Sequence, residues 1–196
     1  EAMEERQVTL GDESFKLPDP FLVLATQNPL EQEGTFPLPE AQMDRFLFKL
    51  RVDYPGQQEE IEVLRRADGA GESVRAVLDG DGLRVASAEA AKTRMDDAVR
   101  GYIVRLVQAT RPGLGKAWKG RELLRCGASP RASLSLQAAA KAQAYLQGRD
   151  HALPQDIADL APDVLRHRLL LTYEAEADGV KTDDVISKLL EAVARP

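Results

Sequence analysis

The spacing of apolar residues changes near residue 56, and this change divides the chain into two kinds of structure. Upstream, short apolar runs and alternating patterns are typical of β-strands. Downstream, apolar residues recur at helical spacing, most clearly at Met95, Val99, Tyr102, Ile103, Leu106 and Val107. The pair Pro55-Gly56 at the change point disfavours both kinds of element. We therefore predict an α/β part at residues 1–55 and an α-helical part at residues 56–196, with mostly α structure in total.

The α/β part is predicted to contain a hairpin and two further strands. Residues 8–10 and 15–17 alternate apolar with polar side chains around turn-forming residues 11–14, which is the pattern of a β-hairpin. The run FLVLA at residues 21–25 is continuously apolar, as expected of a central parallel strand that is covered on both faces. Residues 46–52 alternate again and suit an edge strand with one solvated face.

A predicted helix in the C-terminal part of the chain carries an arginine in its first turn, where a cation is unusual. Ser129 is a predicted N-cap, Pro130 occupies the first helical position, and Arg131 follows in the first turn. The helix dipole disfavours a cation there, whereas helix N-termini attract phosphate. We therefore predict that Arg131 contacts a bound anion. The alternative is an ion pair with a carboxylate from elsewhere in the fold.

Two more polar residues occupy positions suited to a ligand site. Asn28 follows the predicted central strand, at the edge of an open α/β sheet where ligands bind. Its simpler interpretation is an Asn-Pro turn after a strand. Arg45 precedes the predicted edge strand, and its simpler interpretation is a surface arginine paired with Asp44 or Glu40.

Four separated motifs resemble those of the MoxR branch of the AAA+ ATPases, and they occur in the order found in that family. They are EAMEERQVT at residues 1–9, ATQNP at 25–29 with EQEGT at 31–35, PLPEAQMDRF at 37–46, and GASPRA at 127–132 with GRD at 148–150. The resemblance covers nearly the whole chain. It implies that Asn28 is the sensor 1 residue, Arg45 the arginine finger and Arg131 the sensor 2 residue.

The resemblance also implies an architecture and a function. Residues 1–55 would be the C-terminal part of an AAA+ core with a hairpin before sensor 1, and residues 56–196 the lid domain. The intact protein would bind ATP and Mg²⁺ between core and lid and assemble into a ring, expected to be a hexamer. It would perform chaperone-like remodelling of protein clients or cofactor insertion, with a von Willebrand A domain protein as a possible partner. The sequence leaves open whether sensor 2 serves its own or a neighbouring subunit's nucleotide.

Two phosphate-handling motifs of the family do not occur in this sequence. There is no Gly-x-x-x-x-Gly-Lys-Ser/Thr loop and no apolar strand that ends in Asp-Glu. We therefore expect a C-terminal fragment of such an ATPase, inactive in ATP hydrolysis by itself and without a tightly bound cofactor. The alternative is a nucleotide-independent helical module that binds a protein partner.

Charge and cysteine content narrow the classes of function further. The net charge is −6, and residues 1–60 carry 13 acidic against 5 basic side chains, which argues against a general nucleic-acid binder. A single cysteine and the lack of Cys/His clusters at zinc-ligand spacing predict neither a disulfide nor a structural metal. No run approaches the ~20 apolar residues of a membrane span. We expect a cytoplasmic protein without membrane insertion.

Two basic segments are interpreted as structural. Residues 116–125 suit a solvated loop whose Trp118 packs on the helical bundle. The triplet RHR at residues 166–168 lies in a predicted helical run and is interpreted as an exposed face. Neither histidine of the chain has a carboxylate or cysteine at metal or triad spacing, so no catalytic histidine is expected.

Overall fold

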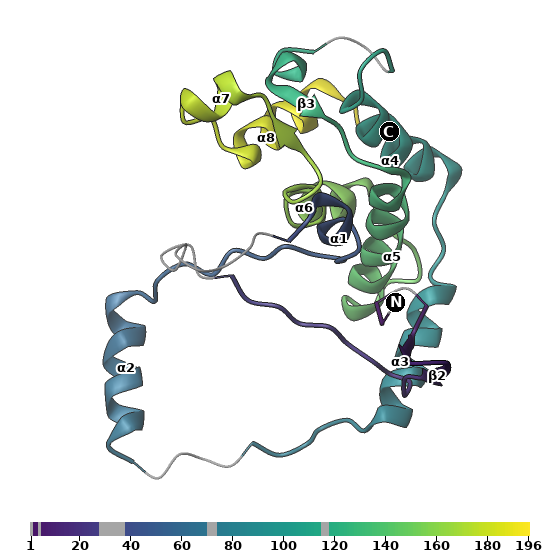
Figure 1. Cartoon of the computed structure of the whole chain (residues 1–196), viewed down its shortest axis with the longest axis vertical. Helices are drawn as coiled ribbons and strands as arrows, with labels where there is room; N and C mark the ends of the chain where they lie inside the picture. The colour runs from purple at the N-terminus through teal and green to yellow at the C-terminus, as the bar shows by residue number, and fades with distance from the viewer. Residues whose placement is uncertain (1, 4, 28–37, 70–73, 115–117) are drawn as a thin grey trace.

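The computed structural model describes residues 2–3, 5–27, 38–69, 74–114 and 118–196, and most of its elements are helices (Figure 1). In chain order they are β1 (Gln7–Leu10), β2 (Glu13–Lys16), α1 (Glu40–Met43), α2 (Gln57–Ala67), α3 (Gly80–Lys92), α4 (Asp97–Ala109), the 3₁₀ turn η1 (Arg121–Leu123), β3 (Leu124–Cys126), α5 (Pro130–Leu146), α6 (Pro154–Leu165), β4 (Leu170–Leu171), α7 (Tyr173–Ala177) and α8 (Thr182–Ala192).

The apolar core lies in the C-terminal half of the chain. All buried apolar side chains of the described residues come from residues 95–189. Helix α5 contacts α3, α4 and α6, and α8 contacts α4 and α6. The buried face of α5 is rich in alanine, which lets neighbouring helices approach closely. The apolar stripe predicted on residues 95–107 is confirmed: residues 99–107 form the core face of α4, and Met95 is buried just before the helix begins. In the part of the chain that the structure describes, no helix has the length and apolar character needed to cross a membrane.

The predicted hairpin is confirmed, whereas the other two predicted strands are wrong. Strands β1 and β2 pair antiparallel, with Val8 opposite Phe15. Residues 21–25 and 46–52 form no strand. A strand requires a neighbour that supplies backbone hydrogen bonds, and the sheets of the described residues contain only β1 with β2 and β3 with β4. Leu24, predicted to be covered on both faces of a sheet, is 93% exposed.

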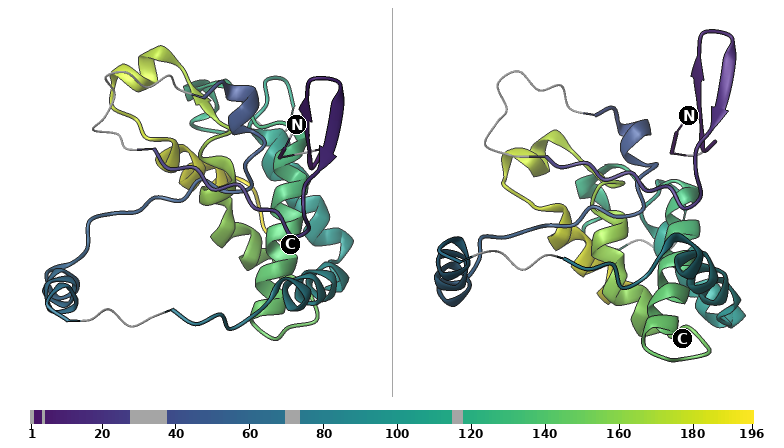
Figure 2. Two further views of the ribbon diagram at one scale, coloured as in Figure 1. Left: turned by 60° about the horizontal axis from the view of Figure 1, so that its bottom comes forward. Right: turned by 90° about the horizontal axis from the view of Figure 1, so that it is seen from below.

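Helix α2 stands apart from the other helices in every view (Figure 1 and Figure 2). Its side chains are exposed except for Ile61, which is half-buried. The packed bundle therefore begins at α3. The predicted domain boundary at residues 55 and 56 stays a prediction.

The segment before α5 is fixed by a close approach to the end of α4. Thr110 Oγ1 accepts a hydrogen bond from the amide of Ala128 at 3.0 Å and donates one to the carbonyl of Val107 at 2.7 Å. The guanidinium of Arg111 donates to the carbonyl of Ala128 at 2.8 Å. A Cβ placed on Gly127 would lie 2.3 Å from the carbonyl oxygen of Thr110, so only glycine fits this contact.

We expect Gly127→Ala to lower the free energy of unfolding by at least about 2 kcal/mol, because the clash involves backbone and no rotamer change relieves it. The matched control is Gly101→Ala within α4, where the nearest atom is the flexible end of Arg105 at 3.3 Å. Alanine has the higher helix propensity, so this control is expected to stabilise the chain by up to about 1 kcal/mol. Urea unfolding of the three chains measures both changes, and equal stability of parent and Gly127→Ala would contradict the argument.

Candidate functional site

The predicted helix start at Ser129 is confirmed. Ser129 is the N-cap of α5, and its side-chain oxygen accepts a hydrogen bond from the amide of Arg131 at 3.1 Å. Pro130 occupies the first turn. Arg131 therefore projects from the positive end of a helix of 17 residues, and its side chain is 42% exposed.

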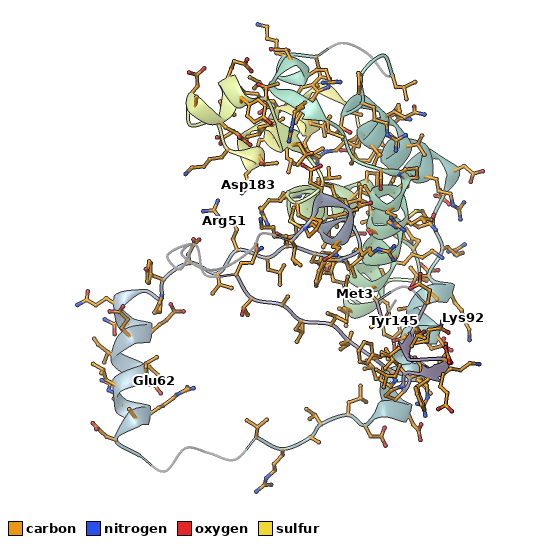
Figure 3. The ribbon with its side chains drawn as sticks, viewed as in Figure 1. Met3, Arg51, Glu62, Lys92, Tyr145 and Asp183 are labelled. Atoms are coloured by element: carbon orange, nitrogen blue, oxygen red, sulfur yellow. The ribbon has the colours of Figure 1, made fainter. Side chains whose placement is uncertain are left out.

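The side chains of Arg45 and Arg131 line the same cavity. Its volume is about 130 Å³, and its lining residues are Met3, Asp44, Arg45, Arg131, Leu134, Ser135 and Arg168. Arg45 follows α1, Arg131 and Ser135 lie on α5, and Arg168 follows α6, so three helix termini and turns meet here. Figure 3 labels Met3, which lies beside α5. Three arginines therefore line one cavity, and Asp44 is the one acidic residue among its described lining residues.

Asp44 is the carboxylate that joins these elements. Arg168 Nε donates to its Oδ1 at 3.0 Å, and Ser129 Oγ donates to its Oδ2 at 2.7 Å. Arg131 lies 3.6 Å from the same Oδ2. The alternative interpretation of Arg131, a carboxylate partner from elsewhere in the fold, is thus present. Because the arginine is 42% exposed, solvent screens this ion pair, which is therefore weak. Glu40, the other acid considered for Arg45, contacts Arg125 at 3.4 Å.

The interpretation of residues 166–168 as an exposed face is wrong. His167 and Arg168 are 7% and 6% exposed, and the Arg166 side chain is 13% exposed. Helix α6 ends at Leu165, so the triplet lies in the turn that follows and faces the segment after α1.

The triplet holds residues 44–51 against the helical bundle. Arg168 donates to the carbonyls of Asp44, Phe46 and Leu47 at 3.1, 2.6 and 3.3 Å. His167 Nε2 donates to the carbonyl of Phe46 at 3.0 Å. Arg166 binds the carbonyl of Lys49 and the carboxylate of Asp183. Arg51 also contacts Asp183, at 3.1 Å (Figure 3). The segment predicted as an edge strand is therefore irregular, and its carbonyls at Phe46, Leu47 and Lys49 accept hydrogen bonds from side chains of the triplet.

Burial lowers the pKa of two members of the triplet, Arg168 and His167. It lowers the pKa of the Arg168 guanidinium, and the ion pair with Asp44 opposes that change. For His167, burial lowers the pKa from 6.5 to about 4, opposed by the hydrogen bond to Phe46 and reinforced by the nearby charge of Arg168. Because a carbonyl only accepts, Nε2 carries the proton of the neutral ring. Nδ1 is buried without a hydrogen-bond partner among the described residues.

The lowered pKa of His167 predicts that the folded chain loses stability in acid. Between pH 6.5 and pH 4 the unfolded chain binds a proton at His167 that the folded chain excludes, so the free energy of unfolding falls as the pH is lowered. The full effect is on the order of 3 kcal/mol. His167→Gln, which can still donate to Phe46, is expected to remove this part of the pH dependence, as measured by urea unfolding from pH 7 to pH 4. His151→Gln, an exposed control, should retain it. Parallel curves for parent and His167→Gln would contradict the assignment.

Asn28 lies outside the described residues, so its prediction as sensor 1 stays a prediction. Asp44 and Arg168 also line the cavity, although the sequence did not predict them as site residues. No local signal identifies Arg168, because α6 ends at Leu165 and helical spacing does not extend to the turn that carries this residue. Trp118 is confirmed as packed on the bundle, with its indole nitrogen donating to the carbonyl of Ala109 at 2.8 Å.

Comparisons with protein families and solved structures agree with this architecture. The model of the "ATPase family associated with various cellular activities (AAA)" matches residues 1–48, and that of the "AAA lid domain" matches residues 121–189. A crystal structure of a candidate ATPase from Cytophaga hutchinsonii superimposes with a TM-score of 0.90 at 40% identity. The match covers 100% of this chain and 60% of that chain.

Two of the three curated relatives compared below carry MoxR names. Chaperone MoxR1 of Mycobacterium tuberculosis is 47% identical over 100% of this chain and 52% of the relative. Uncharacterized protein YeaC of Bacillus subtilis is 42% identical over 100% and 59%, and Protein MoxR of Methylorubrum extorquens is 34% identical over 99% and 60%. The chain thus spans between about half and three fifths of the length of these relatives. It belongs to the MoxR family of AAA+ ATPases.

Proposed function

We propose that this chain supplies the arginine finger, the sensor 2 arginine and the lid of a ring-forming MoxR ATPase. The observation that carries the proposal is that Arg45 and Arg131 line one cavity. An arginine finger acts on nucleotide held by a neighbouring subunit. Because Arg131 lines the same cavity, our proposal is that it serves the same neighbouring nucleotide and not that of its own subunit.

The chemistry of the cavity suits the terminal phosphates of ATP. Guanidinium groups match phosphate oxygens in a planar, bidentate geometry and remain charged when partly buried. Charge on the transferred phosphoryl group is neutralised by such cations in the transition state. The Asp44 carboxylate does not oppose this, because its two oxygens accept hydrogen bonds from Arg168 and Ser129. Arg45 and Arg131 would therefore bind and orient the phosphates, while Asp44 and Arg168 support them.

The proposal for ATP and Mg²⁺ concerns the intact protein. The cationic lining of the cavity fits a triphosphate. Among the described residues no cluster of three His, Cys, Asp or Glu side chains could hold a metal ion, so the role of Mg²⁺ rests on the family. Asn28 is proposed as sensor 1, whose side-chain amide orients the attacking water. This role rests on its place in the family motif.

The wider biological role is also proposed from the family. One relative is named a chaperone, which supports chaperone-like remodelling of protein clients. A hexameric ring, insertion of a cofactor into a client, a von Willebrand A domain partner and a cytoplasmic location belong to the same proposal. Each depends on the intact protein.

Substitution of the three proposed residues tests the assignment in a protein that joins this chain to a phosphate-loop core half. We expect Arg45→Ala to lower kcat on the order of 10³-fold, because the finger acts on the transition state. Arg131→Ala and Asn28→Ala should lower kcat on the order of 10²-fold. Arg100→Ala, which removes an exposed pair with Asp97 on α4, is the control and should hydrolyse ATP like the parent. If all three variants match the parent, the nucleotide-independent interaction module is the better explanation.

Mixed rings test whether Arg45 and Arg131 serve the same neighbouring nucleotide. If they do, every subunit in a mixture of Arg45→Ala and Arg131→Ala proteins presents an incomplete pair, and ATP turnover stays at the level of the separate variants. If Arg131 serves its own subunit, a fraction of the sites becomes complete on mixing and turnover recovers. Mixing each variant with the parent is the control for subunit exchange. Recovery in the mixture of the two variants would overturn the shared site.

A further inference from the structure

Arg168 contacts the backbone on both sides of Arg45. Its guanidinium donates to the carbonyls of Asp44, Phe46 and Leu47 and to the Asp44 carboxylate. The same guanidinium donates to Ser135 Oγ at 3.1 Å. Ser135 lies four residues after Arg131 on α5, so both share one face of that helix. One planar group therefore spans the segment that carries Arg45 and the helix that carries Arg131.

We propose that Arg168 is a positioning residue that sets the placement of Arg45 relative to Arg131. The inference rests on the proposed function of these two arginines as phosphate contacts. The Arg168 side chain is 2% exposed and its hydrogen bonds run to the backbone of residues 44–47, so we infer that it acts through that backbone. Misplacement of a transition-state contact by about 1 Å can cost on the order of 10²-fold in rate.

The chemistry of the contacts requires arginine. A guanidinium presents its donors in a fixed planar fork, whereas a lysine ammonium is a point charge on a flexible stem. Only the fork can reach the carbonyls of residues 44, 46 and 47, a fourth carbonyl at Val164, one carboxylate and one hydroxyl in the geometry observed here. Folding stability alone does not require a guanidinium at residue 168, because apolar side chains can often replace a buried ion pair without loss of stability. The directional contacts to residues 44–47 therefore serve position.

A double-mutant cycle in the joined, ATP-hydrolysing protein tests the inference. We expect Arg168→Lys to lower kcat on the order of 10-fold while the KM for ATP changes less than about threefold, since the finger acts on the transition state. Combined with Arg45→Ala, it should lower kcat no further than Arg45→Ala alone. A residue with a merely structural role would reduce kcat by the same factor in both backgrounds.

Arg166→Lys is the matched control. Arg166 belongs to the same turn and binds the carbonyl of Lys49, Asp163 and Asp183, away from the cavity. Any loss of kcat that it causes should multiply with that of Arg45→Ala. If Arg168→Lys does not fold, as judged by its thermal melt, Ser135→Ala takes its place in the cycle, because it removes one contact of the guanidinium.

The outcomes separate the two proposals. If Arg45→Ala hydrolyses ATP like the parent, the proposed function fails and the inference fails with it. If Arg45→Ala is impaired while Arg168→Lys matches the parent, or multiplies with Arg45→Ala, the positioning role is overturned and the proposed function stands. Loss of kcat on Arg168→Lys that disappears in the Arg45→Ala background supports the inference.

Discussion

The arrangement of the candidate site depends on the buried ion pair between Arg168 and Asp44. Their side chains are 2% and 17% exposed, and the Nε to Oδ1 distance is 3.0 Å. Removing one partner of such a pair leaves an uncompensated buried charge, which costs several kcal/mol. The segment after α1 therefore stays against α5 and α6, although it has no strand partner in the described part of the chain. Because Arg45 follows Asp44 directly in the chain, this ion pair also fixes the position of the Arg45 backbone.

Asp44 extends the same constraint to α5. Its second oxygen accepts from Ser129, the N-cap residue of α5, so one carboxylate fixes the start of the helix from which Arg131 projects. From the other side, the contact of Gly127 with Thr110 fixes the approach to that helix from α4. Arg45 and Arg131, the proposed phosphate contacts, thus lie on elements whose backbone is held by packing and hydrogen bonds, which is the support that a site needs for accurate geometry.

The sequence predicted correctly those parts of the site whose local structure depends on residues adjacent in the chain. An N-cap serine followed by proline defines a helix start locally, and the structure confirms it at residues 129 and 130. The strands at residues 21–25 and 46–52 depended on partners elsewhere, so their apolar patterns could not decide them. The prediction of an exposed face at residues 166–168 was wrong for a similar reason. These three side chains bind carbonyls that lie far away in the sequence, and no local pattern predicts such partners. The convergence of Arg45 and Arg131 on one cavity was accessible only through the family resemblance, since residue spacing carries no such information.

The two arginine partners of Asp44 differ in a way that suits an exchangeable ligand. Arg168 is buried and lies 3.0 Å from Oδ1, whereas Arg131 is 42% exposed and lies 3.6 Å from Oδ2. Solvent screens the second pair, so its loss costs little, while the first pair is expensive to break. Under the proposed function, Arg131 can therefore leave Asp44 for a phosphate oxygen while Arg168 and Ser129 keep the carboxylate in place. The position of Arg45 is then the same before and after nucleotide contact. The contacts of Asp44 with Arg168 and Ser129 stay intact through each round of ATP hydrolysis.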